Sequence, residues 1–201
     1  MSIGGTWIPL FPLNVVLFPG GRLPLRIFEQ RYMDMAKACL RDQSVFGVCL
    51  IREGREVGAP ALPVDIGCTA GIESWDMQQL GMLNVLALGR ERFRILERVV
   101  EKSGLARASV ELLPPDADAP VPDEFAGAVR ILKSALQQLS ERPAAQETRF
   151  DSCAWVSARL AEMLPLPPAA KQLLLELQDG KSRLVRVNEV LEQAGLLREA
   201  S

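Results

Sequence analysis

The chain opens on the stretch Trp7-Ile-Pro-Leu-Phe-Pro-Leu-Asn-Val-Val-Leu-Phe-Pro-Gly-Gly-Arg-Leu-Pro-Leu-Arg-Ile-Phe-Glu-Gln-Arg-Tyr32. Its first half is as apolar as a secretory signal, but Pro9, Pro12 and Pro19 interrupt it and no lysine or arginine precedes it. A signal peptide needs a basic start and an unbroken helical core, so we exclude one here. We expect this half to form short strands instead, at residues 7–11 and 14–17.

Alternation of apolar and polar side chains continues to residue 112. It predicts further strands at residues 45–51, 64–75, 82–88, 93–99 and 106–112. In this half, helical spacing of apolar side chains is convincing only at residues 28–40. Because closure removes exposed strand edges, many short strands with one inserted helix predict a small closed or half-closed β-barrel.

A proline-rich segment follows the last of these strands. Residues 113–122 contain Pro114, Pro115, Pro120 and Pro122, and such a run favours an extended path. The sequence therefore predicts three parts, which are a β domain at 1–115, a linker at 116–122 and a helical domain at 123–201.

Beyond the linker the apolar side chains recur at helical spacing. This spacing predicts about four short helices, which begin near Asp123, Asp151, Pro167 and Ser182. Brief connections between them favour a small bundle. The predicted fold class is therefore α+β, with a barrel carrying one inserted helix and then a bundle.

The sequence lacks the usual catalytic groups, since its 201 residues include no histidine. This excludes Ser-His-Asp and Cys-His catalysis and removes the commonest metal ligand. Acidic pairs such as Glu73 with Asp76 have no evident partner that would shift their pKa values, so we interpret them as exposed carboxylates. We expect no enzymatic activity, no cofactor and no metal.

The string Asp179-Gly-Lys-Ser182 imitates the end of a phosphate-binding loop. Such a loop needs another glycine five residues before Gly180, where Leu175 stands. We interpret Gly180 as the C-cap of one helix and Ser182 as the N-cap of the next.

The charge of the chain disfavours nucleic acid, because the net charge is -2 and the pI is near 5.4. One feature favours it, since Arg90, Arg92, Arg94 and Arg98 alternate along a predicted strand and could form a phosphate-facing stripe. Interspersed glutamates favour intramolecular ion pairs for these arginines instead, with Glu29 as a candidate partner.

Four cysteines, at irregular spacing and without a CxxC pair, predict buried reduced thiols in a cytoplasmic protein. No apolar window approaches the roughly 20 residues that span a bilayer. We therefore expect no membrane association.

The opening stretch at residues 7–32 strongly resembles the start of the Lon substrate-binding domain family. Further resemblance follows in family order at Phe46-Gly-Val48, at Ile66-Gly-Cys-Thr-Ala70 where the family usually has IGT or VGT, and at Gly89-Arg-Glu-Arg-Phe-Arg-Ile95. In the helical half, Ala161-Glu-Met-Leu-Pro-Leu166 and Lys171-Gln-Leu-Leu-Leu-Glu-Leu177 are also similar to Lon.

This resemblance implies a PUA-like pseudo-barrel followed by a helical bundle, and a role in recognising polypeptide. In Lon this region precedes an ATPase and a peptidase, whereas this sequence stops at Ser201. We therefore expect a stand-alone relative of the Lon domain without either activity.

Three classes of function follow, in order of preference. The first is a polypeptide-binding or adaptor module in protein quality control, with unfolded segments and a protease or chaperone as partners. The second is an RNA-binding PUA-like module that uses the arginine stripe, and the last is an enzyme. The sequence assigns no oligomeric state.

We expect a polypeptide to bind in a cleft between barrel and bundle. The apolar candidates for its lining are Leu25, Ile27, Phe28, Tyr32 and Trp75, and the alternative is that all of them are ordinary core. Candidate polar contacts are Glu29, Arg90 and Arg92.

Overall fold

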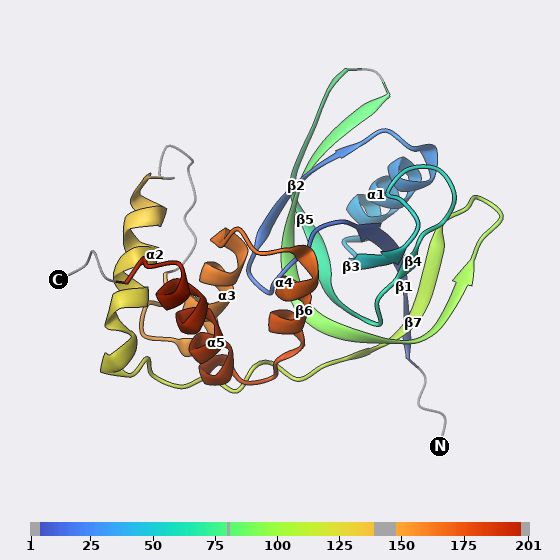
Figure 1. Cartoon of the computed structure of the whole chain (residues 1–201). Coiled ribbons are helices and arrows are strands. Elements are labelled where there is room, and N and C mark those ends of the chain that lie inside the picture. The colour runs from blue at the N-terminus through green and yellow to red at the C-terminus, as the bar shows by residue number, and fades with distance from the viewer. Residues whose placement is uncertain (1–4, 80, 139–147, 198–201) are drawn as a thin grey trace. The chain divides into compact units, whose positions relative to one another are not determined.

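The computed structural model describes residues 5–79, 81–138 and 148–197. The chain divides into two compact units, one that ends at Pro115 and one that begins at Asp116. We call the first the barrel unit and the second the helical unit (Figure 1).

The barrel unit is built from strands with a helix inserted after the second of them. The strands are β1 (Thr6–Leu13), β2 (Arg22–Ile27), β3 (Phe46–Glu53), β4 (Leu62–Pro63), β5 (Ile66–Gln79), β6 (Met82–Val100) and β7 (Ala106–Leu112). The helix is α1 (Gln30–Asp42). The α+β class predicted from the sequence is confirmed.

The sheet closes on itself. Its strands follow the order β1-β7-β6-β5-β3-β4, and β1 also pairs with β3 in parallel. This parallel pair joins the two ends of the run β1-β7-β6-β5-β3 into a barrel. The strand β2 lies outside the run and pairs with β6, so within the described residues its other edge carries no strand.

Strand β6 corrects one sequence prediction, because it replaces the two separate strands expected at 82–88 and 93–99. Gly89, which lies between the two expected strands, is an interior position of β6. A Cβ atom there would lie 2.2 Å from the carbonyl oxygen of Phe18. The loop before β2 is bonded to this point, since the amide of Gly20 donates to the Gly89 carbonyl at 2.9 Å and the Gly89 amide donates to the Gly21 carbonyl at 2.8 Å.

The same loop corrects a second prediction, because residues 14–17 do not form a strand. Leu17 and Phe18 are buried, so their apolar character serves the core rather than a sheet. The next strand, β2, was not predicted. Its Pro24 interrupts the expected pattern, and proline is tolerated there because β2 is an edge strand.

Aromatic packing connects α1 to the barrel core. The rings of Phe11 on β1 and Tyr32 on α1 stack with their centroids 4.2 Å apart, and Phe46 on β3 lies 6.3 Å from Phe11. The helix was predicted at 28–40 and begins two residues later, at Gln30, with Glu29 as its N-cap residue. Phe28 is therefore outside the helix.

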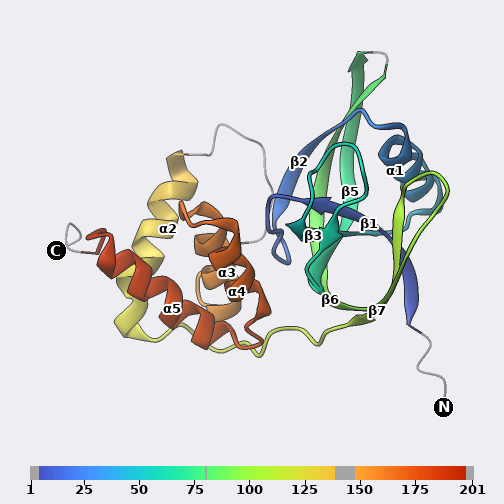
Figure 2. The ribbon, with the colours of Figure 1, turned by 45° about the vertical axis from the view of Figure 1, so that its right-hand side comes forward.

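The helical unit contains a 3₁₀ turn, η1 (Asp123–Phe125), and the helices α2 (Ala126–Gln138), α3 (Cys153–Met163), α4 (Pro168–Glu176) and α5 (Gly180–Gln193) (Figure 2). The starts of α3 and α5 differ from the prediction. Ser152, not Asp151, caps α3 by accepting the amide of Trp155 at 3.0 Å. Asp179, not Ser182, caps α5.

Gly180 is the first residue of α5 and not the C-cap of α4, which ends at Glu176. A Cβ atom at Gly180 would lie 2.5 Å from the backbone nitrogen of Ala154. Glycine therefore permits the starts of α3 and α5 to touch.

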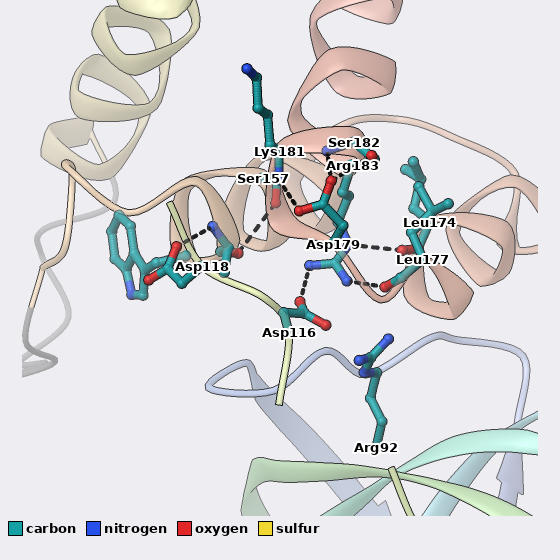
Figure 3. Close-up of polar contacts among 12 residues, drawn as sticks. Arg92, Asp116, Asp118, Ser157, Leu174, Leu177, Asp179, Lys181, Ser182 and Arg183 are labelled. Atoms are coloured by element: carbon teal, nitrogen blue, oxygen red, sulfur yellow. Dashed lines mark hydrogen bonds and ion pairs between the residues drawn. The ribbon is translucent and has the colours of Figure 1, made fainter. Parts of the chain in front are cut away.

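The segment predicted as a linker is packed within the helical unit. Ala117 forms a bridge with Asp179, and Pro120 forms one with Ser152. Arg183 on α5 adds a buried anchor, since it donates to Asp116 and to the carbonyls of Leu174 and Leu177 (Figure 3). The backbone and carboxylates of this segment are thus bonded to helices.

Candidate functional site

The barrel unit has an apolar groove beside the edge strand β2. Its volume is about 330 Å³. Its lining comes from the end of β1, from β2 and its continuation into α1, and from the loop after β3. The lining residues are Phe11, Leu13, Val15, Leu23, Pro24, Leu25, Arg26, Ile27, Phe28, Glu29, Tyr32, Glu56 and Val57.

Three large apolar side chains of this groove are exposed, in addition to Pro24. Val15 is 41% exposed, Phe28 is 54% exposed and Val57 is 55% exposed. Each comes from a different connecting segment, and all of them line the same groove. Single exposed apolar residues are common, whereas these three are grouped around one concavity.

Hydrogen bonds and an ion pair hold the connecting segments in place. The carboxylate of Glu56 accepts the backbone amide of Asn14 at 2.6 Å, which joins the loop after β3 to the loop after β1. The carboxylate of Glu29 lies 3.0 Å from the guanidinium of Arg31. Arg31 also covers the ring of Tyr32 at 4.6 Å and donates to the carbonyl of Gly104.

Tyr32 lies where the groove meets the core. Burial raises the pKa of its hydroxyl above the ordinary value. The charge of Arg31 opposes this rise in pKa, whereas the carboxylates of Glu29 and Glu56 add to it. Tyr32 is therefore neutral at physiological pH, and both carboxylates are near enough to influence it.

The structure brings most of the predicted site residues together. Leu25, Ile27 and Tyr32 are buried in the core and also line the groove, and Phe28 is exposed at its mouth. Trp75 is exposed on β5, opposite Val85, and is outside the groove lining. Of the predicted polar contacts, Glu29 lines the groove and Arg90 and Arg92 do not.

The sequence did not indicate Val15, Glu56 and Val57 as site residues. Val15 was assigned to a strand that does not form. Glu56 and Val57 lie in the segment Arg52-Glu-Gly-Arg-Glu-Val-Gly58, which is charged and has no apolar period. The sequence shows only one valine in a polar loop there. The fold is needed to see that this valine lies beside the groove.

Comparison with known proteins identifies the family. The profile of the ATP-dependent protease La (LON) substrate-binding domain matches residues 7–193. The chain belongs to the Lon substrate-binding domain family.

The chain is similar to part of longer proteins. The Lon protease of Anaeromyxobacter dehalogenans (strain 2CP-C) is 28% identical over 92% of this chain and 23% of that protease. Protein cereblon of Gallus gallus is 32% identical over 53% of this chain and 24% of that protein. The chain thus spans about a quarter of the length of these relatives.

Solved structures of the Lon domain share the fold. The crystal structure of a Lon N-terminal domain protein from Xanthomonas campestris matches with a TM-score of 0.76 and 35% identity, over 92% of this chain and 98% of that one. The N-terminal domain of Lon protease from the Mycobacterium avium complex matches with a TM-score of 0.58 at 19% identity, which shows the fold alone.

In this Lon-type barrel the predicted arginine stripe is not continuous. Arg92 is buried and donates to the carbonyl of Pro114, because the chain after β7 covers it. Arg98 is half-buried and donates to the carbonyl of Ala61. Arg94 is exposed and faces Glu111 at 3.9 Å. The structure therefore does not favour phosphate binding along β6, and Glu29 pairs with Arg31 rather than with the stripe.

Two other candidate groups are engaged within the fold. The carboxylate of Glu73 forms an ion pair with Arg22 at 2.7 Å, and the hydrogen bond from Arg22 lowers the pKa of Glu73. The carboxylate of Asp179 accepts the amides of Lys181 and Ser182. It thus occupies the donors that a phosphate would need at the start of α5.

The four cysteines are buried, as expected, and none forms a disulfide. Within the described residues there is no group of three or more acidic or cysteine side chains placed to hold a metal ion. None of the helices in that part of the chain is both long and apolar enough to cross a membrane.

Proposed function

We propose that the barrel unit binds apolar segments of other polypeptides in the groove beside β2, as a recognition module without catalytic activity. The observation that carries this proposal is the convergence of Val15, Phe28 and Val57 on one apolar groove. Burial of these side chains would give a bound segment most of its affinity, since each large apolar side chain contributes about 1.5–3 kcal/mol when fully buried.

The edge of β2 supports binding of an extended segment. Proline on an edge strand directs its missing N–H away from the ladder, so we expect Pro24 to face the open edge. Alternation along an antiparallel strand then turns the backbone groups of Arg26 to the same edge. A short segment could add main-chain hydrogen bonds there, while Pro24 limits their number.

The family supports the proposed class of ligand. The matched region is the substrate-binding domain of Lon, and its protease and ATPase regions are not matched. The sequence contains no histidine, which supports a module without catalytic activity. A role as an adaptor in protein quality control, with a protease or chaperone that receives the bound segment in the cytoplasm, extends this proposal.

The test is the affinity of the whole chain for a labelled unfolded peptide rich in leucine and phenylalanine, measured by fluorescence anisotropy. Phe28→Ser combined with Val57→Ser should weaken binding about tenfold or more, because two apolar contacts are lost. These side chains are exposed, so the fold should persist, and thermal unfolding checks this.

Two control variants accompany it. Leu173→Ser removes an exposed leucine from α4 and should leave affinity unchanged. Trp75→Ser should also leave it unchanged, and a loss there would extend the site to β5. Unchanged affinity in the Phe28 and Val57 variant would contradict the proposal. So would cleavage of the peptide, seen as fragments whose amount increases with incubation time.

A further inference from the structure

The groove carries carboxylates next to its exposed apolar side chains. Glu29 directly follows Phe28 in the sequence, and Glu56 directly precedes Val57. Both carboxylates line the groove, as do Phe28 and Val57. An apolar side chain that entered between Phe28 and Val57 would therefore bring its sequence neighbours close to negative charge.

Two arginines lie near these two carboxylates, but neither forms an ion pair with Glu56. Arg31 balances Glu29, with their charged groups 3.0 Å apart. Arg26 is the one arginine in the lining, and its guanidinium lies 3.7 Å from the sulfur of Met82 on the neighbouring strand β6. Among the described residues, Glu56 forms no ion pair.

Glu56 keeps acceptor capacity for a ligand. One of its oxygens accepts the amide of Asn14 at 2.6 Å. That bond fixes the position of the carboxylate, and an ionised carboxylate has about four acceptor sites in all. A lysine or arginine of a bound segment would thus meet a carboxylate that is already oriented.

We propose that the groove selects polypeptide segments in which an apolar residue lies beside a lysine or arginine, and that Glu56 is the residue that recognises the basic side chain. This inference rests on the proposed function and adds the chemistry of the preferred ligand. Segments with an acidic residue at that place are disfavoured, because like charges repel at the same carboxylate.

The experiment uses one apolar peptide in three versions, with lysine, glutamine or glutamate beside the apolar core. Affinities are measured for the whole chain at low and at high NaCl. We expect the lysine version to bind about two- to fivefold more tightly than the glutamine version, as suits a partly exposed ion pair. The glutamate version should bind most weakly, and salt should reduce the differences.

The variant Glu56→Gln should abolish the preference for lysine. Glutamine keeps a carbonyl oxygen for the amide of Asn14, so the loop stays in place. The matched control is Glu53→Gln, which removes an equal charge from an exposed position of β3 outside the groove. It should retain the preference.

The outcomes separate this inference from the proposed function. Equal affinity for the three peptides, or equal loss of the lysine preference in both variants, would overturn the inference while binding of apolar peptides stands. Failure of all three peptides to bind would remove the proposed function itself.

Discussion

Arg183 is a buried charge that joins distant parts of the helical unit. Its guanidinium bonds Asp116 and the carbonyls of Leu174 and Leu177. Arg183→Met keeps the apolar stem but removes the donors for all of these groups. Removal of one partner from a buried pair costs about 3–5 kcal/mol. We expect a loss of this size in the free energy of unfolding, measured by urea denaturation followed by far-UV circular dichroism.

The control is Arg186→Met on the same helix. Arg186 is exposed and pairs with Glu189 at 3.0 Å. Exposed pairs contribute about 0.2–1 kcal/mol, so this variant should be nearly as stable as the wild type. Similar losses in the two variants would contradict the role assigned to Arg183.

Glu162 on α3 should make the stability of the helical unit depend on pH. Burial raises its pKa from 4.5 to about 7, against the opposing charges of Arg159 and Lys171. Between these pH values the folded state holds a proton that the unfolded state has released, so stability falls as the pH rises. Its side chain is 25% exposed, and solvent screening reduces the effect to the order of 1–2 kcal/mol.

Thermal unfolding from pH 5 to pH 8 measures this dependence. Glu162→Gln keeps a side chain that can accept from Arg159 but cannot titrate, and it should flatten the profile in that window. Glu189→Gln, on the exposed side of α5, should keep the wild-type slope. A slope that persists in Glu162→Gln would assign the pH dependence to another group.

At the scale of single residues, the sequence indicated five residues of the groove lining, which are Leu25, Ile27, Phe28, Glu29 and Tyr32. Tyr32 is on a helix that periodicity predicted, whereas Leu25 and Ile27 are on β2, a strand that periodicity did not predict. Glu56 and Val57 are in a polar loop, and their meaning depends on the Glu56–Asn14 hydrogen bond between loops 42 residues apart. No local pattern carries that information.

The contact between the starts of α3 and α5 gives a prediction about elements. Alanine normally stabilises a helix relative to glycine by about 1 kcal/mol. At Gly180 the added Cβ would meet the backbone of Ala154 at 2.5 Å, and a backbone cannot move as a side chain does. We expect Gly180→Ala to destabilise the helical unit by about 1–3 kcal/mol in urea denaturation.

Gly127→Ala on α2 is a control for which we expect no loss of stability. The nearest atom to a Cβ there is the end of the Leu197 side chain at 3.0 Å, which can rotate away. This variant should be as stable as the wild type or more so. Stabilisation by both substitutions would show that α3 and α5 are farther apart than described.

Elements were predictable where burial follows one face of a strand. The prediction at 106–112 coincides with β7 because apolar and polar residues alternate along its sequence, although Ser109 is buried and Leu112 is exposed. Gly89 and Pro24 interrupt the apolar–polar alternation, yet each lies inside a strand. Gly89 led us to divide β6 into two strands, and Pro24 led us to miss β2. In both cases a long-range approach or an open edge explains the residue, and neither is visible in local sequence.

At the scale of the whole molecule, we expect a bound peptide to protect one unit and not the other. Hydrogen–deuterium exchange with saturating apolar peptide should slow for the segments that line the groove, at residues 13–15, 23–29 and 56–57. The helices α2–α5 should exchange at unchanged rates. Protection confined to the helical unit would place the ligand elsewhere.

The barrel and bundle classes were predictable from periodicity, because one face of each strand or helix must be buried. The sequence predicted a closed or half-closed barrel, but it did not predict which pair of strands closes it. The parallel pair of β1 with β3 depends on the intervening β2 and α1, which return the chain to the side of its first strand. The family resemblance implied this class of barrel, whereas periodicity did not specify the strand pairing.

The pairing of β1 with β7 sets an order of events during synthesis. β1 can pair with β3 early, but Thr6 is the partner of Val110, so the barrel closes only after about a hundred further residues have left the ribosome. The nascent barrel must remain open during that interval, with its apolar interior accessible to chaperones. A stalled chain that lacks β7 should therefore be sensitive to protease, whereas one that extends through the barrel unit should resist it.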